Sequence, residues 1–139
     1  MKIYLAARFS RAEEIYGHLQ EVERLGHEVT SRWCRPDANH RLPDEVDQSD
    51  PRGAIFARQD MEDLESSQLV ICFTEPPPPA SRGGRHVEFG LALAWGKNIF
   101  VVGPRENVFY WDPNVRQFTD WESCLLTIAS WTPYVPIQT

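Results

Sequence analysis

The sequence predicts an α/β fold in which helices cover both faces of a parallel sheet. Strand-like and helix-like segments alternate strictly along the chain, which is the order found in βαβ units. Two continuous apolar runs, residues 69–73 and 99–102, are typical of parallel strands that are buried on both faces. We therefore expect a flavodoxin-like (Rossmann-like) three-layer sandwich, with a parallel sheet of about five strands in the order 2-1-3-4-5.

The first third of the chain is predicted to form two short strands and one helix. Residues 2–7 form an apolar strand, and residues 28–32 form the second strand. The helix between them ends at Gly26, since glycine commonly ends a helix. Residues 35–51 are polar and rich in Pro, Asp and Asn, which indicates a loop. The helix is recognised by apolar residues at helical spacing, namely Ala12, Ile15, Leu19 and Val22.

Three more helices are predicted. Asp50–Pro51 is a typical helix start, with the aspartate as cap and the proline in the first position. The next helix opens at the Gly83–Gly84 pair and ends at Gly96, and Thr119 with Glu122 forms a capping-box pair ahead of the last one. The expected apolar face of the first of these helices consists of Ala54, Ala57, Met61 and Leu64; the last helix carries Trp121, Leu125 and Ile128.

Length and composition limit the function. The 139 residues fit one domain, which we place at residues 1–131 with a C-terminal tail at 132–139. A net charge of -6 argues against a nucleic acid polymer as partner, because such binding needs a basic surface. Neither a signal-peptide pattern nor an apolar stretch of about 18 residues is present, so we expect a cytoplasmic protein with no membrane partner.

The cysteines also favour a cytoplasmic protein, and the histidines bear on metal binding. Cys34, Cys72 and Cys124 are far apart and unpaired in spacing, which indicates a reducing compartment without a disulfide framework. Cys72 lies within an apolar strand and is expected to be a small core residue. The histidines show no metal-ligand spacing, so no metal is expected.

The predicted strand order has a switch point between strands 1 and 3, where ligands bind outside the carboxyl ends of the strands. The loops at residues 7–11 and 74–84 therefore converge there. Their arginines, hydroxyls and glycines suit an anion, although surface loops are often rich in Arg and Ser. The residues expected to bind substrate are Ala7, Arg8, Phe9, Ser10, Ser81, Arg82, Gly83 and Gly84, with Arg11 beside them.

Glu88 is the candidate nucleophile. It lies in the first turns of the third helix, where the positive helix terminus is expected to stabilise the ionised carboxylate. An ordinary capping acid is an equally good interpretation of its spacing. Asp60 is a candidate second acid, although spacing alone favours a solvated acid like Glu62 and Asp63. Tyr4 either orients the carboxylate or is a half-buried core aromatic.

Three blocks of the sequence, residues 2–9, 59–64 and 84–97, resemble the nucleoside 2-deoxyribosyltransferase family, which includes the deoxynucleoside 5'-monophosphate N-hydrolases. The resemblance implies cleavage of an N-glycosidic bond with Glu88 as nucleophile, Asp60 beside the leaving base and Tyr4 orienting the glutamate. It implies a glycosyl-enzyme, transfer of the sugar to another base or to water, and no cofactor. It also implies a homodimer or higher homo-oligomer, for which residues 109–111 and Trp121 are candidate contacts.

The chain departs from the family pattern at two positions. Many members have an aspartate opening strand 3, where this chain has Gln68, and transferases of free nucleosides tend to have an acid where this chain has Arg82. An arginine there favours a 5'-monophosphate substrate. The same departures keep open an alternative, a non-catalytic nucleotide-binding module on this fold. The G-x-G-x-x-G and P-loop motifs are absent, which argues against a dinucleotide oxidoreductase or a P-loop enzyme.

Overall fold

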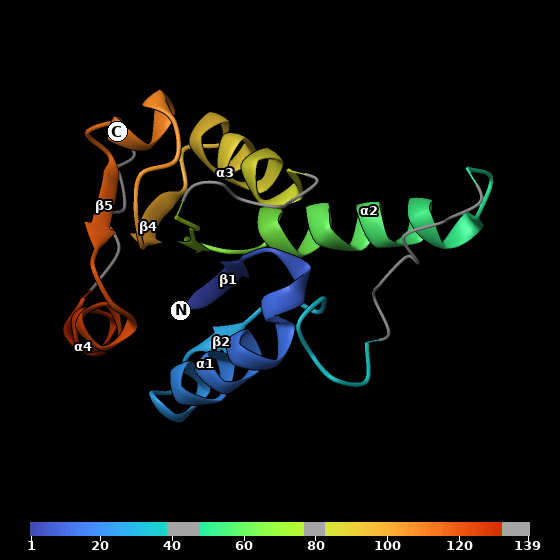
Figure 1. Ribbon diagram of the computed structural model, residues 1–139. Helices are drawn as coiled ribbons and strands as arrows, with labels where there is room; N and C mark the ends of the chain where they lie inside the picture. The colour runs from blue at the N-terminus through green and yellow to red at the C-terminus, as the bar shows by residue number, and fades with distance from the viewer. Residues whose placement is uncertain (39–47, 77–82, 132–139) are drawn as a thin grey trace, which may run out of the picture.

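The computed structural model describes residues 1–38, 48–76 and 83–131, and the predicted C-terminal tail lies outside this part. Within the described residues, five strands form one sheet in the order β2-β1-β3-β4-β5, and every neighbouring pair is parallel (Figure 1). The predicted fold class and strand order are confirmed. The strands are β1 Lys2–Ala6, β2 Glu28–Val29, β3 Leu69–Phe73, β4 Asn98–Val102 and β5 Val115–Phe118.

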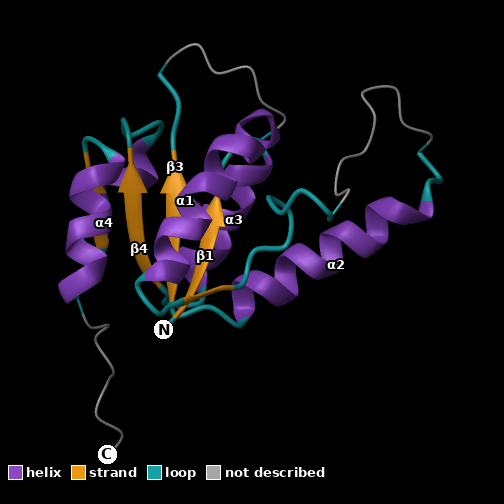
Figure 2. Ribbon diagram, turned by 90° about the horizontal axis from the view of Figure 1, so that it is seen from below, coloured by secondary structure: helices purple, strands orange, loops and turns teal. Residues whose placement is uncertain are grey.

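Helices lie on both sides of this sheet. They are α1 Ala12–Arg24, α2 Pro51–Glu65, α3 Gly84–Ala94 and α4 Trp121–Ser130, with short 3₁₀ helices η1 Phe9–Arg11 and η2 Val108–Trp111. On one face, the Trp121 ring of α4 lies 4.5 Å from the His18 ring of α1, measured between centroids. On the other face lies α3, and α2 runs outward beside it (Figures 1 and 2). None of the described helices is both long and apolar enough to cross a membrane.

The register of the central strands decides which side chains face α3. Tyr4 pairs with Val70, and Ala6 pairs with Cys72. Alternate residues of a strand point to the same side of a sheet, so these four share one face. All are buried in the core. The three cysteines are likewise buried, and Cys72 is a core residue as the sequence predicts.

The two edge strands differ from the sequence prediction. β2 covers only two residues, because the side chains that follow it bind α2: Thr30 Oγ1 donates to the Asp63 carbonyl at 2.7 Å, and Arg32 Nε donates to the Asp63 carboxylate at 3.0 Å. β5 is not recognisable from an apolar pattern, since Arg116 and Gln117 occupy its middle. Edge strands need less burial than central ones, so their sequences carry a weaker signal.

The start of α4 also differs from the prediction. The Asp120 side chain accepts a hydrogen bond from the Ser123 amide at 2.8 Å and is the cap of the helix. The predicted capping box of Thr119 and Glu122 is therefore wrong. Asp120 directly precedes the helix, so its carboxylate reaches the third helical amide and also favours the positive helix terminus.

α2 begins as predicted but is less buried than predicted. The Asp50 carboxylate accepts a hydrogen bond from the Arg52 amide at 3.0 Å. Of the expected apolar face, Leu64 is buried, whereas Met61 is 41% exposed and Ala54 is exposed as well. The reason is the direction of α2, whose C-terminal end lies next to the sheet while its N-terminal part extends away from it (Figure 2).

Candidate active site

Glu88 lies in the second turn of α3. The residue before the helix, Gly83, has a φ of 91°, a left-handed conformation that favours glycine. Gly84 then opens the helix, which has no side-chain cap. The Glu88 oxygen Oε2 is buried. The backbone turn at the glycine pair thus lets α3 start where its second turn places a carboxyl group against the sheet.

Tyr4 of β1 is fully buried and lies beside this carboxyl group. Burial, followed by the charge of Glu88, holds the pKa of Tyr4 well above its usual value, while a hydrogen-bond interaction with Tyr4 lowers the pKa of Glu88. Neither the Tyr4 hydroxyl nor Glu88 Oε2 has a partner with full hydrogen-bond geometry. Such catalytic hydrogen bonds are often long in ligand-free sites. Tyr4 is therefore both a core aromatic and a direct neighbour of Glu88.

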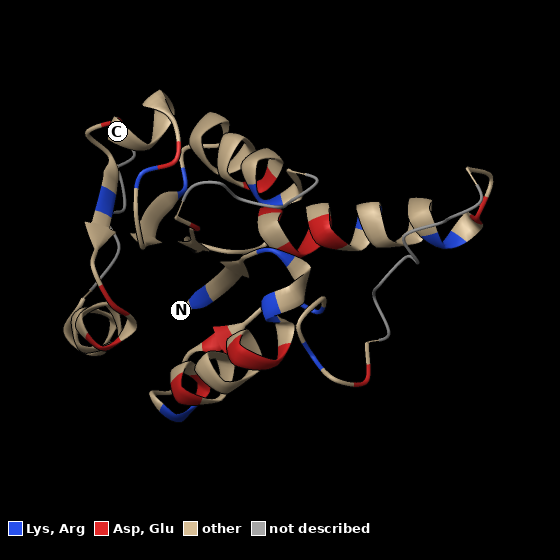
Figure 3. Cartoon of the chain, viewed as in Figure 1, with Lys and Arg blue, Asp and Glu red and all other residues tan. Residues whose placement is uncertain are grey.

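Asp60 reaches the same cluster from α2. Its negative charge raises the pKa of both Glu88 and Tyr4, so Asp60 faces the buried cluster. The expectation of a solvated acid is also wrong for Asp63, whose Oδ1 lies 2.9 Å from Nη2 of Arg32. Figure 3 shows that the C-terminal half of α2, next to α3, is rich in acidic residues. Packing of α2 against α3 thus places a second carboxylate near Glu88.

Burial dominates the ionisation of Glu88. Desolvation, and then the charge of Asp60, raises the pKa of Glu88 from 4.5 to about 8. The expectation that the helix terminus keeps this carboxylate ionised is therefore wrong for the ligand-free site. A helix terminus contributes up to about 2 kcal/mol, whereas a pKa shift of this size corresponds to roughly 5 kcal/mol. Burial therefore favours the protonated form of Glu88 in the ligand-free site.

The arginines expected to bind an anion have carboxylate neighbours. Arg11 binds Glu14 through two donors, at 3.0 Å and 2.6 Å. Glu75, just after β3, places Oε1 3.6 Å from Nη1 of Arg11 and 3.9 Å from Nε of Arg8. This oxygen is buried and accepts no hydrogen bond. Glu75 is a site residue that the sequence analysis missed, because only the fold places it between the two arginines.

The remaining predicted substrate residues are spread over both loops. Ala7 is buried, and Phe9 is 38% exposed with its ring tilted against Trp33 at 6.1 Å. Trp33 is held by a hydrogen bond from Nε1 to the Leu5 carbonyl at 2.7 Å. Ser10 is exposed. Gly83 and Gly84 begin α3 as described above, while Ser81 and Arg82 lie outside the described residues.

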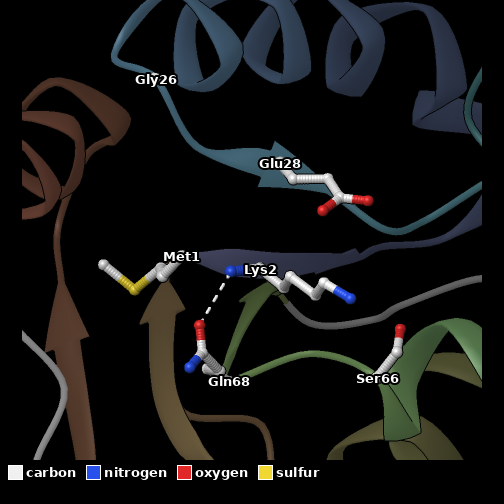
Figure 4. Close-up of a pocket in the computed structure, with 6 residues that line it drawn as sticks. All are labelled: Met1, Lys2, Gly26, Glu28, Ser66 and Gln68. Carbon is white, nitrogen blue, oxygen red and sulfur yellow. Dashed lines mark hydrogen bonds between the residues drawn. The ribbon is translucent and has the colours of Figure 1, made fainter.

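Gln68 lies at the opposite edge of the sheet from this cluster. Its side-chain oxygen accepts a hydrogen bond from the Lys2 amide at 3.0 Å, and it lines a shallow depression of about 520 Å³ (Figure 4). The depression also includes Glu28 and lies at the amino ends of the strands. All strands run in the same direction, so this edge is remote from the switch point. The departure at Gln68 therefore affects strand pairing and leaves the Glu88 cluster untouched.

No protein-family model matches the chain, and no curated protein matches its sequence. Solved structures do match. The 2-deoxyribosyltransferase of Bacillus psychrosaccharolyticus superposes with a TM-score of 0.70 at 22% identity, covering 97% of this chain and 100% of that one. The CMP N-glycosidase BcmB of Clostridium botulinum superposes with a TM-score of 0.60 at 21% identity, covering 94% of this chain and 100% of that one. A conserved protein of Enterococcus faecalis V583 superposes with a TM-score of 0.59 at 18% identity, covering 92% of this chain and 96% of that one.

The chain has the fold of the 2-deoxyribosyltransferase and the CMP N-glycosidase. The match covers nearly the whole of each chain, so the resemblance seen in three sequence blocks extends to the complete architecture. At this level of identity the likeness establishes the shared fold, and the reaction has to be argued from the cluster itself.

Replacing Glu88 should change how stability depends on pH. The folded protein binds a proton at Glu88 that the unfolded chain releases between pH 4.5 and about 8, so this group lowers stability as pH rises through that window. Glu88→Gln cannot ionise. We expect the difference in unfolding free energy between Glu88→Gln and wild type to shift by roughly 2–5 kcal/mol in favour of the folded variant from pH 4 to pH 9 in denaturant titrations.

A matched control is Glu65→Gln, which removes an exposed acid at the end of α2 and should give no such difference between the two pH values. Asp60→Asn should shift stability in the same direction as Glu88→Gln, but less, because it removes the second cause of the raised pKa. Equal pH profiles for wild type and Glu88→Gln would show that Glu88 titrates normally.

Proposed function

We propose that this protein is an enzyme that cleaves the N-glycosidic bond of a (deoxy)nucleoside or its 5'-monophosphate, with Glu88 as the nucleophile. The observation that carries the proposal is the buried carboxyl group of Glu88 beside Tyr4 and Asp60. Two close carboxyl groups, one of them with a strongly raised pKa, are typical of glycosidic cleavage. The shared fold with a deoxyribosyltransferase and an N-glycosidase supports the same reaction class.

In the proposed reaction, ionised Glu88 attacks C1' of the sugar, and a bond forms between a carboxylate oxygen and C1'. The bond from C1' to the base nitrogen breaks, and its electron pair leaves with the base, which takes a proton from Asp60. Water or a second base then attacks C1' of the glycosyl-enzyme ester and gives its proton to Asp60, while the ester bond breaks and its electron pair returns to the Glu88 carboxylate. Two inversions give overall retention. Tyr4 holds the carboxylate in place by a hydrogen bond that shortens when substrate binds.

The raised pKa of Glu88 fits a reaction in which Glu88 attacks the sugar and Asp60 protonates the leaving base. Like charges at close range keep one proton on the pair of carboxyl groups, and in the ligand-free site Glu88 holds it. Passing that proton to Asp60 produces an ionised nucleophile and a proton donor for the leaving base in one step. The exposed ring of Phe9, which packs against the buried indole of Trp33, offers an apolar face for the base.

The alternative, a non-catalytic nucleotide-binding module, loses part of its basis. It rested on the departures at Gln68 and Arg82, and Gln68 serves strand pairing at the far edge of the sheet. The two readings differ in turnover, since a binding module would bind nucleotide without releasing base.

Base release is the direct test. Deoxynucleosides, ribonucleosides and their 5'-monophosphates are incubated with the protein, with and without a second base, and the products are separated by chromatography. We expect release or exchange of base from at least one substrate, and a loss of at least about 10³-fold in rate for Glu88→Gln, which removes the nucleophile. Ligand binding without turnover at high protein concentration would favour the binding module instead.

Glu75 is the residue we expect to tune the choice between a 5'-hydroxyl and a 5'-phosphate. It lies between Arg8 and Arg11 at the carboxyl edge of the sheet and offsets their positive charge. Glu75→Gln should raise kcat/KM for a 5'-monophosphate relative to the free nucleoside by about tenfold, as expected for one removed like charge at short range. The kcat/KM ratio of the two substrates measures the effect.

The control for this variant is Glu13→Gln, which removes the same charge from an exposed position in the first turn of α1. An unchanged substrate ratio in Glu75→Gln would place the 5' group elsewhere in the site.

We also propose that the chain forms a homodimer or a higher homo-oligomer. The outward part of α2 exposes Ile55 at 53%, and η2 exposes Phe109 at 66% and Trp111 at 60%. Exposed apolar groups of this size are typical of interfaces. The other two candidate contacts serve the subunit itself, since Tyr110 is buried and Trp121 packs on His18.

Sedimentation velocity should give at least twice the chain mass of 16.0 kDa for wild type. Ile55→Lys should weaken that association, because a charge in an apolar interface remains unpaired. Leu126→Lys is the control, since Leu126 is 74% exposed on α4, on the other side of the sheet. A monomer at all concentrations would contradict the proposal.

A further inference from the structure

The first two turns of α3 are attached to the chain between β4 and β5 by a buried ion pair. Arg85 donates from Nε to Glu106 Oε2 at 3.0 Å and from Nη2 to Glu106 Oε1. The two side chains are only 2% and 6% exposed. Arg85 precedes Glu88 by three residues, so both side chains lie on the same face of the helix.

Two further contacts reach η2 from the same turns. The Phe89 and Tyr110 rings stack with a centroid distance of 3.9 Å and an interplanar angle of 6°. His86 Nδ1 lies 3.1 Å from the Tyr110 hydroxyl. Arg85, His86 and Phe89 therefore surround Glu88 in sequence and connect its helix to Glu106 and Tyr110. We name these five residues the α3 clamp.

The helix needs such a restraint. α3 has no side-chain cap and no acid in its first turn, and its N-terminal neighbour is a glycine with positive φ. A small rotation of the helix would move Glu88 away from Tyr4, because both lie where α3 crosses the sheet. The ion pair is a weak source of stability: its Arg85 Nη1 is buried without an acceptor, and buried pairs lose much of their attraction to desolvation. Its two parallel hydrogen bonds fix the position of Arg85, and thus of α3, relative to Glu106.

We propose that Arg85, Glu106 and Tyr110 are positioning residues that hold Glu88 against Tyr4 through the α3 clamp. This inference rests on the proposed function of Glu88 as nucleophile. None of the three needs to touch substrate, and their effect is exerted through the position of α3. A misplacement of about 1 Å in a catalytic group can lower the rate about 10²-fold.

The test uses two variants of the full chain, Glu106→Gln and Tyr110→Phe. The first keeps the shape of the side chain and removes its charge, and the second keeps the stacked ring and removes only the hydroxyl. We expect kcat to fall by about 10- to 100-fold in Glu106→Gln and by less in Tyr110→Phe, with KM changed by less than about threefold. Glu122→Gln and Tyr16→Phe, which lie outside the clamp, are the matched controls, and circular dichroism confirms folding.

A second measurement needs no substrate. In protein labelled with carbon-13 at glutamate side chains, the Glu88 carboxyl is titrated by NMR. A loosened α3 admits water, so both clamp variants should lower its midpoint from about 8 toward 4.5, while the controls leave it unchanged. Unchanged kcat and unchanged titration in folded variants would overturn the clamp. An inactive wild type would count against the proposed function, and the titration would still decide on the clamp.

Discussion

The site depends on one constraint, which is that the carboxyl group of Glu88 is kept out of water. Desolvation outweighs the favourable field of the α3 terminus, so the ligand-free protein holds this group mostly protonated. The reaction that we propose needs the opposite form. In the proposed reaction, Asp60, whose charge contributes to the raised pKa of Glu88, accepts the proton. The interaction with Tyr4 acts in the opposite direction and lowers the pKa of Glu88.

The parallel sheet explains why these groups meet. Each strand ends at the same edge, and the order β2-β1-β3-β4-β5 separates the connections of β1 and β3 to opposite faces. Side chains from β1, α2 and α3 can therefore meet at the carboxyl ends of β1 and β3. At the other edge the same parallel arrangement leaves Gln68 and Lys2 to serve strand pairing. The difference at Gln68 therefore lies far from the Glu88 cluster.

Arginines near the carboxyl ends of the strands lie close to carboxylates on other elements. Arg32 binds Asp63, Arg85 binds Glu106, and Glu75 lies between Arg8 and Arg11. The first two pairs join elements and help to position α2 and α3. Glu75 differs because its distances suit charge compensation more than hydrogen bonding, which leaves an acceptor available at the proposed substrate site. A chain with net charge -6 can in this way place arginines at the proposed substrate site without a basic surface.

The parallel sheet, its strand order and the position of Glu88 near the start of α3 could be predicted from the sequence, whereas β5 could not. The individual strands and helices follow from apolar periodicity, glycines and caps, which act between residues close in the chain, and the strand order is a common one for such an alternation. Four features became evident only in the folded chain: Asp60 faces inward, Asp63 is paired, Glu75 lies between two arginines, and burial raises the pKa of Glu88. Those properties arise from burial and from charges on other elements, and neither can be evaluated until packing brings distant segments together.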